Sequence, residues 1–226
     1  MDLSFSKIST WNSCKYQYYC KYVLLMDFPT NQYQEFGQII HQVLENAYTK
    51  KFKTRNDLIR EFYKLAKGTQ VNKAPFLKDA QQLMFQFPMN ELSNQVVDVE
   101  YRFKIPVTED INLVGVIDRI DIIDDDTLLI TDYKTNKAMD LKDYVLQMQL
   151  YNYAIKCSFP EYKKRILDWY YLRFNKHNQV VVPDKVNDKI KNFCVNIVND
   201  MNNETVWTKN KNQYCGFCPM KEKCFG

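Results

Sequence analysis

Residues 115–134 read GVIDRIDIIDDDTLLITDYK, and this stretch decides the fold. Two apolar, strand-like runs flank an acidic turn, which predicts a β-hairpin. Side chains alternate between the two faces of a strand, so Asp132 and Lys134 point the same way. A hairpin that turns about Asp125 sets Asp118 opposite Asp132, with Cβ atoms roughly 5 Å apart.

The two opposed carboxylates point to a bound metal. Like charges placed across a strand pair repel, whereas a divalent cation between them would attract both carboxylates. The apolar residues before Asp118 and Asp132 indicate buried strands, and buried carboxylates need partners. An ammonium from Lys134 alongside could hold or polarise an attacking water. The pattern favours metal-assisted phosphodiester hydrolysis over the solvated salt bridge that a lone Asp-x-Lys would indicate.

Outside the hairpin, apolar periodicity predicts a layered arrangement of helices and strands. The hairpin strands are expected over residues 112–123 and 127–133, and further strands over 96–105, 165–174 and 178–183. Helices are expected over 3–25, 34–50, 55–67, 77–90, 138–156 (with Asp140 as a helix N-cap) and 184–203. The tail from Trp207 is expected to be a loop. This order predicts an α/β (α+β) domain with a mixed central sheet.

The composition fits a chain that can build one sizeable core. The 226 residues are 46% hydrophobic and 15% aromatic, which suits one large domain. No apolar run is long enough for a transmembrane helix, and the first residues lack the features of a signal peptide. We therefore expect a cytoplasmic, reducing compartment and no membrane partner. A formal net charge of +4 permits a nucleic-acid-binding patch without arguing for one.

The cysteines cluster toward the C-terminus. The sequence has seven: Cys14, Cys20, Cys157, Cys194, Cys215, Cys218 and Cys224. A disulfide framework is not expected in a reducing compartment. The last three form C-x2-C-x5-C, which suits a metal or cluster and leaves one position for a ligand from elsewhere. The residues alone leave an iron–sulfur cluster, a zinc ion and free thiols open.

The hairpin resembles that of the PD-(D/E)XK nuclease superfamily, specifically its RecB-like exonuclease branch. That branch carries a G-x-x-D-R-x-D block and a D-Y-K-T block, which match residues 115–121 and 132–135. The resemblance implies that Asp118 and Asp132 are metal ligands and that Lys134 is the catalytic lysine. It also implies a restriction-endonuclease-like α-β-β-β-α-β core.

The resemblance extends to the helices on either side of the hairpin. Gly37 and His41 match a G-x-x-x-H pattern, which implies that His41 completes the metal shell. The backbone carbonyl of Tyr133 is implied as a further ligand. Gln147 and Tyr151 match a Q-x-x-x-Y pair that is implied to position the nucleic-acid strand. Because they are four residues apart, they share one face of their helix.

Several nearby residues keep two interpretations. Gln149 and Tyr153 offer the same spacing in another register of the helix. Glu100 is either a supporting acid of the site or an ordinary strand glutamate. Glu45 either assists the site or caps the apolar stripe of its helix. Asp121 points to the face opposite Asp118 and is expected to be a salt-bridge partner.

The cysteine layout resembles that of AddB-type nucleases and CRISPR-associated exonucleases. In those proteins one cysteine before the nuclease core and three after it hold a [4Fe–4S] cluster. Ser4, Ser6 and Cys14, followed by aromatic residues, look similar to their N-terminal cysteine segment. The resemblance therefore implies Cys14, rather than Cys20, as the fourth ligand beside Cys215, Cys218 and Cys224. Cys20, Cys157 and Cys194 are expected to be buried thiols.

These features predict a single nuclease domain over residues 1–226. Its expected parts are an N-terminal helical part at 1–33 that contributes a cluster cysteine, a core at 34–204 and an iron–sulfur tail at 205–226. A helical insertion is expected within the core at about 52–92.

The resemblance implies a DNA exonuclease that uses Mg²⁺ or Mn²⁺ and acts on single-stranded DNA or DNA ends. It would serve recombination, repair or CRISPR adaptation in a bacterium, an archaeon or a phage, with a helicase or a CRISPR integrase as a partner. One alternative is a non-catalytic iron–sulfur module that binds DNA beside such a partner. Another is a zinc-stapled structural protein. The aromatic N-terminal helix either stacks on bases or packs as core.

Overall fold

The computed structural model describes residues 1–139, 144–182 and 185–225. Contacts gather the chain into two compact units, each assembled from separate segments. The first comprises Met1–Asn31, Phe103–Gly115 and Asp184–Gly226, and the second comprises Gln32–Arg102 and Val116–Pro183. The sequence predicts the two terminal segments as additions to a core. In the structure they form one unit with Phe103–Gly115.

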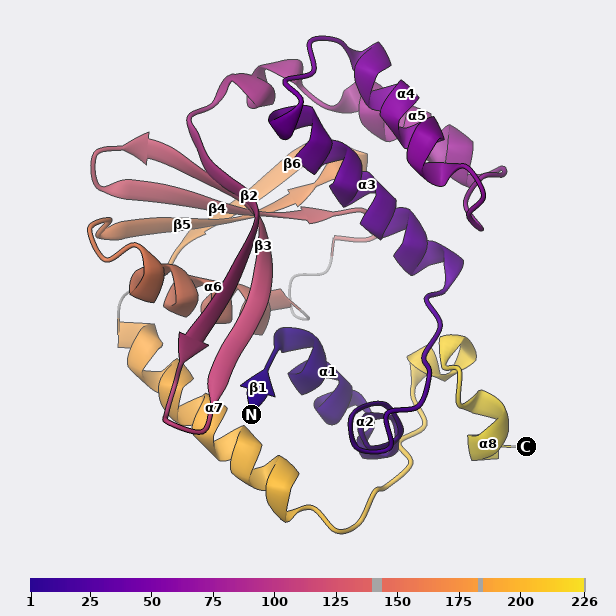
Figure 1. The fold of residues 1–226 in the computed structure, drawn as a ribbon, viewed down its shortest axis with the longest axis vertical. Coiled ribbons are helices and arrows are strands. Elements are labelled where there is room, and N and C mark those ends of the chain that lie inside the picture. Colours follow the sequence, from indigo (N-terminus) through magenta and orange to yellow (C-terminus); the bar gives the residue numbers. More distant parts are fainter. Residues whose placement is uncertain (140–143, 183–184, 226) are drawn as a thin grey trace. The chain divides into compact units, whose positions relative to one another are not determined.

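The second unit contains the hairpin and the predicted core helices (Figure 1). Its strands are β2 (Val96–Pro106), β3 (Asn112–Asp124), β4 (Thr127–Lys134), β5 (Lys164–Tyr171) and β6 (Lys176–Val181), the first two of which continue into the other unit. Its helices are α3 (Gln32–Thr49), α4 (Arg55–Ala66), α5 (Phe76–Gln86), η2 (Met89–Ser93), α6 (Val145–Ser158) and η4 (Leu172–Phe174). The order α3, β2, β3, β4, α6, β5 is the predicted α-β-β-β-α-β core.

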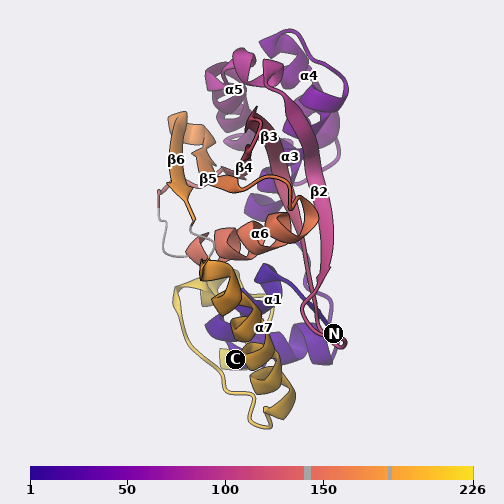
Figure 2. The same ribbon diagram turned by 90° about the vertical axis from the view of Figure 1, so that its left-hand side faces the viewer.

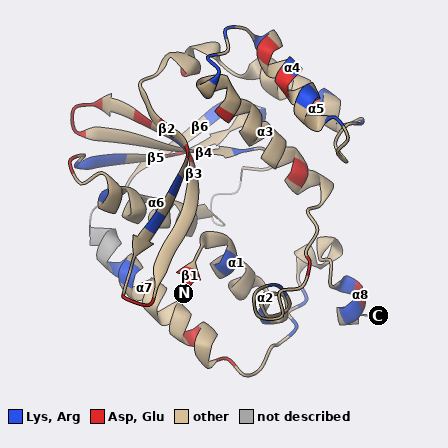
Figure 3. Ribbon diagram, in the orientation of Figure 1, with Lys and Arg blue, Asp and Glu red and all other residues tan. Residues whose placement is uncertain are grey.

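The sheet is mixed, as predicted. Strand β3 pairs with β2 and runs antiparallel to β4, β4 runs parallel to β5, and β5 runs antiparallel to β6. Arg119 lies opposite Thr131, and Ile120 lies opposite Ile130. Continuing that register by one residue sets Asp118 opposite Asp132, as the sequence predicts. The acidic turn that joins β3 to β4 is visible in Figure 3.

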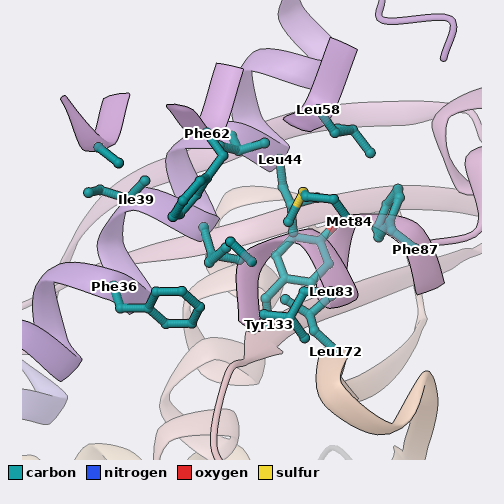
Figure 4. Packing of buried hydrophobic residues seen from close by; sticks show 14 of the residues in the cluster. Phe36, Ile39, Leu44, Leu58, Phe62, Leu83, Met84, Phe87, Tyr133 and Leu172 are labelled. Atoms are coloured by element: carbon teal, nitrogen blue, oxygen red, sulfur yellow. The ribbon is translucent and has the colours of Figure 1, made fainter. Parts of the chain in front are cut away.

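Strand β4 is central, and all eight of its residues are buried. Burial on both faces explains the uninterrupted apolar run at residues 128–130. Helices α3, α4 and α5 cover the face that carries Tyr133. Their apolar side chains form the main core, which includes Phe36, Phe62, Leu83 and Leu172 (Figure 4). Figure 2 shows α4 and α5 on one side of these strands and α6 on the other.

Some element boundaries differ from those that the sequence predicts. Strand β5 ends at Tyr171 and not at residue 174, because the chain turns through η4 to Asn175 at a φ of 46°. Helix α6 begins at Val145, and the expected N-cap Asp140 lies outside the described residues. Cys157 is exposed, contrary to expectation, because it lies in the last turn of α6, whereas Cys20 and Cys194 are buried.

The first unit contains the two terminal segments. Its elements are β1 (Asp2–Leu3), α1 (Phe5–Ser13), α2 (Lys15–Tyr18), the π-helix η1 (Tyr19–Val23), α7 (Lys185–Asn203), η5 (Gln213–Phe217) and α8 (Lys221–Phe225). The tail expected to be a loop therefore contains short helical turns. In the described part of the chain, none of the helices is long and apolar enough to cross a membrane.

The aromatic side chains of the N-terminal helices form a core within this unit. Trp11 and Tyr18 are buried, and the Trp207 ring stacks on Tyr19 with centroids 4.8 Å apart. Trp11 and Tyr18 are therefore core residues and are not available to stack on bases. Gly115 belongs to the same unit, where a Cβ would lie 2.5 Å from the Phe103 ring. Close packing of that ring explains the glycine of the G-x-x-D-R-x-D block.

Candidate active site

Metal-ligating atoms from a helix and two strands converge within the second unit. His41 on α3, Glu100 on β2 and Asp118 on β3 each place one such atom within 4.8 Å of the others. All three residues are partly buried. An imidazole nitrogen with carboxylate oxygens is a donor set that suits Mn²⁺ or Mg²⁺, because hard cations prefer oxygen and imidazole binds first-row metals.

Asp118 is held from two sides. His41 Nδ1 lies 3.1 Å from Asp118 Oδ1, and the backbone N–H of Tyr133 donates to Asp118 Oδ2 at 2.6 Å. The hairpin therefore orients the carboxylate through the main chain of the opposite strand. Tyr133, whose carbonyl the resemblance implies as a ligand, contacts the site through its N–H group.

Glu100 has an unusual backbone conformation for a residue within a strand. Its φ is 53°, in the left-handed region that glycine adopts without cost. A non-glycine residue held there stores of order 1–3 kcal/mol, and such strain clusters at functional sites. The conformation accompanies a side chain that lies with His41 and Asp118. The structure therefore favours Glu100 as an acidic residue of the site over Glu100 as an ordinary strand glutamate.

Asp132 and Lys134 form a buried ion pair beside this group. The ammonium of Lys134 lies 2.5 Å from Asp132 Oδ2 and donates to Gln147 Oε1 at 3.0 Å. Gln147 Nε2 donates in turn to the hydroxyl of Tyr151 at 2.8 Å. Hydrogen bonds thus link Lys134 on β4, through Gln147, to Tyr151 on α6. Among the described residues, Asp132 is paired with Lys134 through Oδ2 and does not belong to the group of three whose ligand atoms lie within 4.8 Å of one another.

The pKa values of the site groups reflect an excess of negative charge. Burial by itself would lower the pKa of His41, but the carboxylates of Asp118, Asp132 and Glu100 raise it to about 9. Burial raises the pKa of Asp132 against the opposing effect of the Lys134 ammonium. Burial and the Asp118 charge raise the pKa of Glu100. A divalent cation would relieve this repulsion, which supports a metal at the site.

Tyr133 links the site to a polar cluster on the opposite face of the sheet. Arg119 is 1% exposed, and its guanidinium donates to the hydroxyls of Tyr48 and Tyr133, the latter at 3.4 Å. It also pairs with Asp121 at 2.7 Å and with Glu91 at 3.1 Å. The expected salt bridge of Asp121 is therefore confirmed, and it is buried. The hydroxyl of Tyr133 is fixed on this face while its backbone N–H binds Asp118.

The remaining sequence-predicted residues lie around this centre. Gly37 lies against Thr135 at the end of β4, where a Cβ would be 3.4 Å from the threonine hydroxyl. Its lack of a side chain lets α3 approach the strand that carries Lys134. Glu45 contacts Gln42 and stands outside the ligand group, although its charge contributes to the raised pKa of Glu100.

The predicted cysteine ligands all lie in the first unit. The backbone N–H of Asn210 donates to Cys14 Sγ at 3.5 Å, and that of Asn212 donates to Cys215 Sγ at 3.3 Å. Burial raises the pKa of Cys224, and the charges of Cys218, Cys14 and Cys20 raise it further. The tail therefore lies against the segment that carries Cys14.

Comparisons with known proteins identify the family of the chain. A family model of the PD-(D/E)XK nuclease superfamily matches residues 2–225. The chain is similar to a solved structure described as a "Putative exonuclease" from Eubacterium rectale, with a TM-score of 0.59 and 10% identity over 97% of this chain and 86% of that chain. At this identity the likeness shows the fold alone.

A second solved structure, of SSO0001, covers 97% of this chain and 95% of its own at 13% identity. Its TM-score of 0.42 is too low to carry an argument. No curated protein matches the chain significantly.

Proposed function

Because the chain belongs to the PD-(D/E)XK nuclease superfamily, we propose that it is a DNA exonuclease that depends on Mg²⁺ or Mn²⁺. Its substrate would be single-stranded DNA or DNA ends. The observation that carries the proposal is the convergence of His41, Glu100 and Asp118 within 4.8 Å, beside the buried Asp132–Lys134 pair. A module that only binds DNA has no need of a buried ammonium next to a metal-ligating group.

The residues of the site have separate tasks in this proposal. His41, Glu100, Asp118 and Asp132 would hold the metal ion. When bound, the metal would act as a Lewis acid that stabilises the negative charge developing on the phosphate. Lys134, fixed between Asp132 and Gln147, orients the attacking water and offsets the same charge. The hydroxyl of Tyr151 stays protonated, because burial and the nearby carboxylates raise its pKa well above the ordinary value.

DNA digestion tests the proposed activity. Linear single-stranded DNA, linear duplex and closed circular duplex, each labelled internally, are incubated with the protein in the presence of Mn²⁺, Mg²⁺ or EDTA. We expect the linear substrates to be degraded with either metal, the circle to survive, and EDTA to stop the reaction. Undiminished digestion in EDTA would contradict the metal requirement, and cutting of the closed circle would contradict an exonuclease.

We also propose that Cys14, Cys215, Cys218 and Cys224 hold a [4Fe–4S] cluster. Backbone N–H groups that donate to Cys14 and Cys215 are the kind of hydrogen bond that tunes cluster sulfurs.

Substituting one cluster cysteine tests this ligand set. After anaerobic purification, Cys218→Ala should lose most of its iron and its visible cluster absorbance, because three thiolates cannot complete the site. The control is Cys157→Ala, which removes an exposed thiol from the other unit and should keep the iron content of the wild type. Full iron content in Cys218→Ala would show that the ligands are misassigned.

The cysteine layout and the sequence blocks favour the RecB-like or CRISPR-associated type within the superfamily. On that basis we propose roles in recombination, repair or CRISPR adaptation, with a helicase or a CRISPR integrase as a partner. Co-purification with either partner, compared between wild-type protein and Cys218→Ala, tests these assignments.

A further inference from the structure

The ammonium of Lys134 has a third neighbour, from a residue that the sequence motifs do not include. Its Nζ lies 3.7 Å from the centroid of the Tyr144 ring. An ammonium over an aromatic face within about 6 Å is attracted by the ring quadrupole, more strongly where water is excluded. Lys134 is only 8% exposed, so this contact belongs to the desolvated part of the site.

Tyr144 is itself held in place. Asn136 Nδ2 donates to the Tyr144 hydroxyl at 2.6 Å. Asn136 lies two residues after Lys134, and Tyr144 directly precedes α6, whose Gln147 also binds the lysine. The lysine is thus contacted both by the start of α6 and by the residue before that helix. The hydrogen bond from Asn136 to the Tyr144 hydroxyl therefore helps to fix the ring whose face lies over the Lys134 ammonium.

The contacts together define one position for the ammonium. Lys134 has three N–H donors, and Asp132 and Gln147 account for two acceptors. The Tyr144 ring occupies a further side of the ammonium without accepting a conventional hydrogen bond. A lysine side chain otherwise moves among many rotamers, and fixing it before the reaction removes that cost from the transition state.

We propose that Tyr144 is a positioning residue, whose ring holds the Lys134 ammonium in place for phosphodiester cleavage. This inference rests on the proposed function. It predicts that loss of the aromatic face has the larger effect on cleavage, and that loss of the hydroxyl that holds the ring has a smaller one. It also predicts that loss of the ring affects the rate of the chemical step more than substrate binding.

Steady-state cleavage kinetics with Mn²⁺ test the proposal. Tyr144→Leu and Tyr144→Met keep an apolar side chain but lose the ring, and we expect kcat to fall about tenfold with little change in KM. Tyr144→Phe keeps the ring and should restore most of kcat. The control is Tyr63→Leu, which removes a 39% exposed ring whose hydroxyl likewise accepts from an amide, that of Gln81 at 2.6 Å.

The reactivity of Lys134 gives a readout that does not depend on cleavage. Reductive methylation, quantified by mass spectrometry, should modify Lys134 faster in Tyr144→Leu than in the wild type. Lys164, whose side chain is 65% exposed, serves as the internal reference. Unchanged kcat and unchanged methylation in Tyr144→Leu would overturn the proposal. So would a loss in Tyr144→Phe as large as in Tyr144→Leu, or a loss confined to KM.

Lys134→Ala in the same assay separates this inference from the proposed function. If Lys134→Ala cleaves at the wild-type rate, the proposed function fails together with the inference. If Lys134→Ala is inactive while Tyr144→Leu behaves as the wild type, only the role of Tyr144 fails.

Discussion

Lys134→Ala is expected to lower the rate of DNA cleavage by about 10²–10³-fold, the usual cost of removing one preorganised group that stabilises developing charge. The lysine lies 2.5 Å from Asp132 in a buried position, where an ammonium acts more strongly than in water. Initial rates on labelled linear DNA with saturating Mn²⁺ measure the effect. Circular dichroism and iron content should match the wild type, because the fold and the cysteines are not altered.

Lys164→Ala is the matched control for this experiment. It removes a lysine that pairs with Asp126 at 3.2 Å on the surface of the same unit, and cleavage should stay within about twofold because exposed pairs contribute little. Wild-type cleavage by Lys134→Ala would refute the assignment of the catalytic lysine.

Arg119→Met is expected to destabilise the protein by about 3–5 kcal/mol, the range for breaking a buried ion pair by removing one partner. The substitution would leave Asp121 fully buried without its guanidinium and would release Tyr48, Tyr133 and Glu91. Urea unfolding followed by circular dichroism measures the loss. Arg60→Met is the control, since Arg60 is 75% exposed in its pair with Asp57 and should change stability by less than about 0.5 kcal/mol.

A double substitution identifies the physical cause. If the penalty comes from an uncompensated buried charge, Arg119→Met combined with Asp121→Asn should be more stable than Arg119→Met alone. A loss below about 1 kcal/mol for Arg119→Met, or simple additivity in the double variant, would contradict this account of the cluster.

The hairpin and its register could be predicted from the sequence because strand alternation and the acidic turn leave few arrangements. The spacing between the two aspartates is enough to place Asp118 opposite Asp132, and four-residue spacing places Gln147 and Tyr151 on one helix face. These inferences depend only on the local periodicity of strands and helices, and the folded chain keeps that local geometry at these residues.

Other features depend on tertiary structure that periodicity does not reveal. The left-handed backbone at Glu100 has no glycine to mark it, so the sequence does not decide whether Glu100 lies beside His41 and Asp118. Tyr144 precedes its helix and belongs to no periodic pattern. Arg119 offered a usable clue, because a charged residue inside an otherwise apolar strand requires buried partners. The helix α8 is too short to show a period at all.

Binding of Mn²⁺, followed by the loss of its free-ion electron paramagnetic resonance signal, tests the central claim most directly. The wild type should bind the ion, and Asp118→Asn, which keeps the shape of the side chain, should bind it at least about tenfold more weakly. Asp126→Asn, which alters a partly exposed turn aspartate, should bind it as the wild type does. Equal Mn²⁺ binding by the wild type and Asp118→Asn would contradict a metal site in which Asp118 is a ligand.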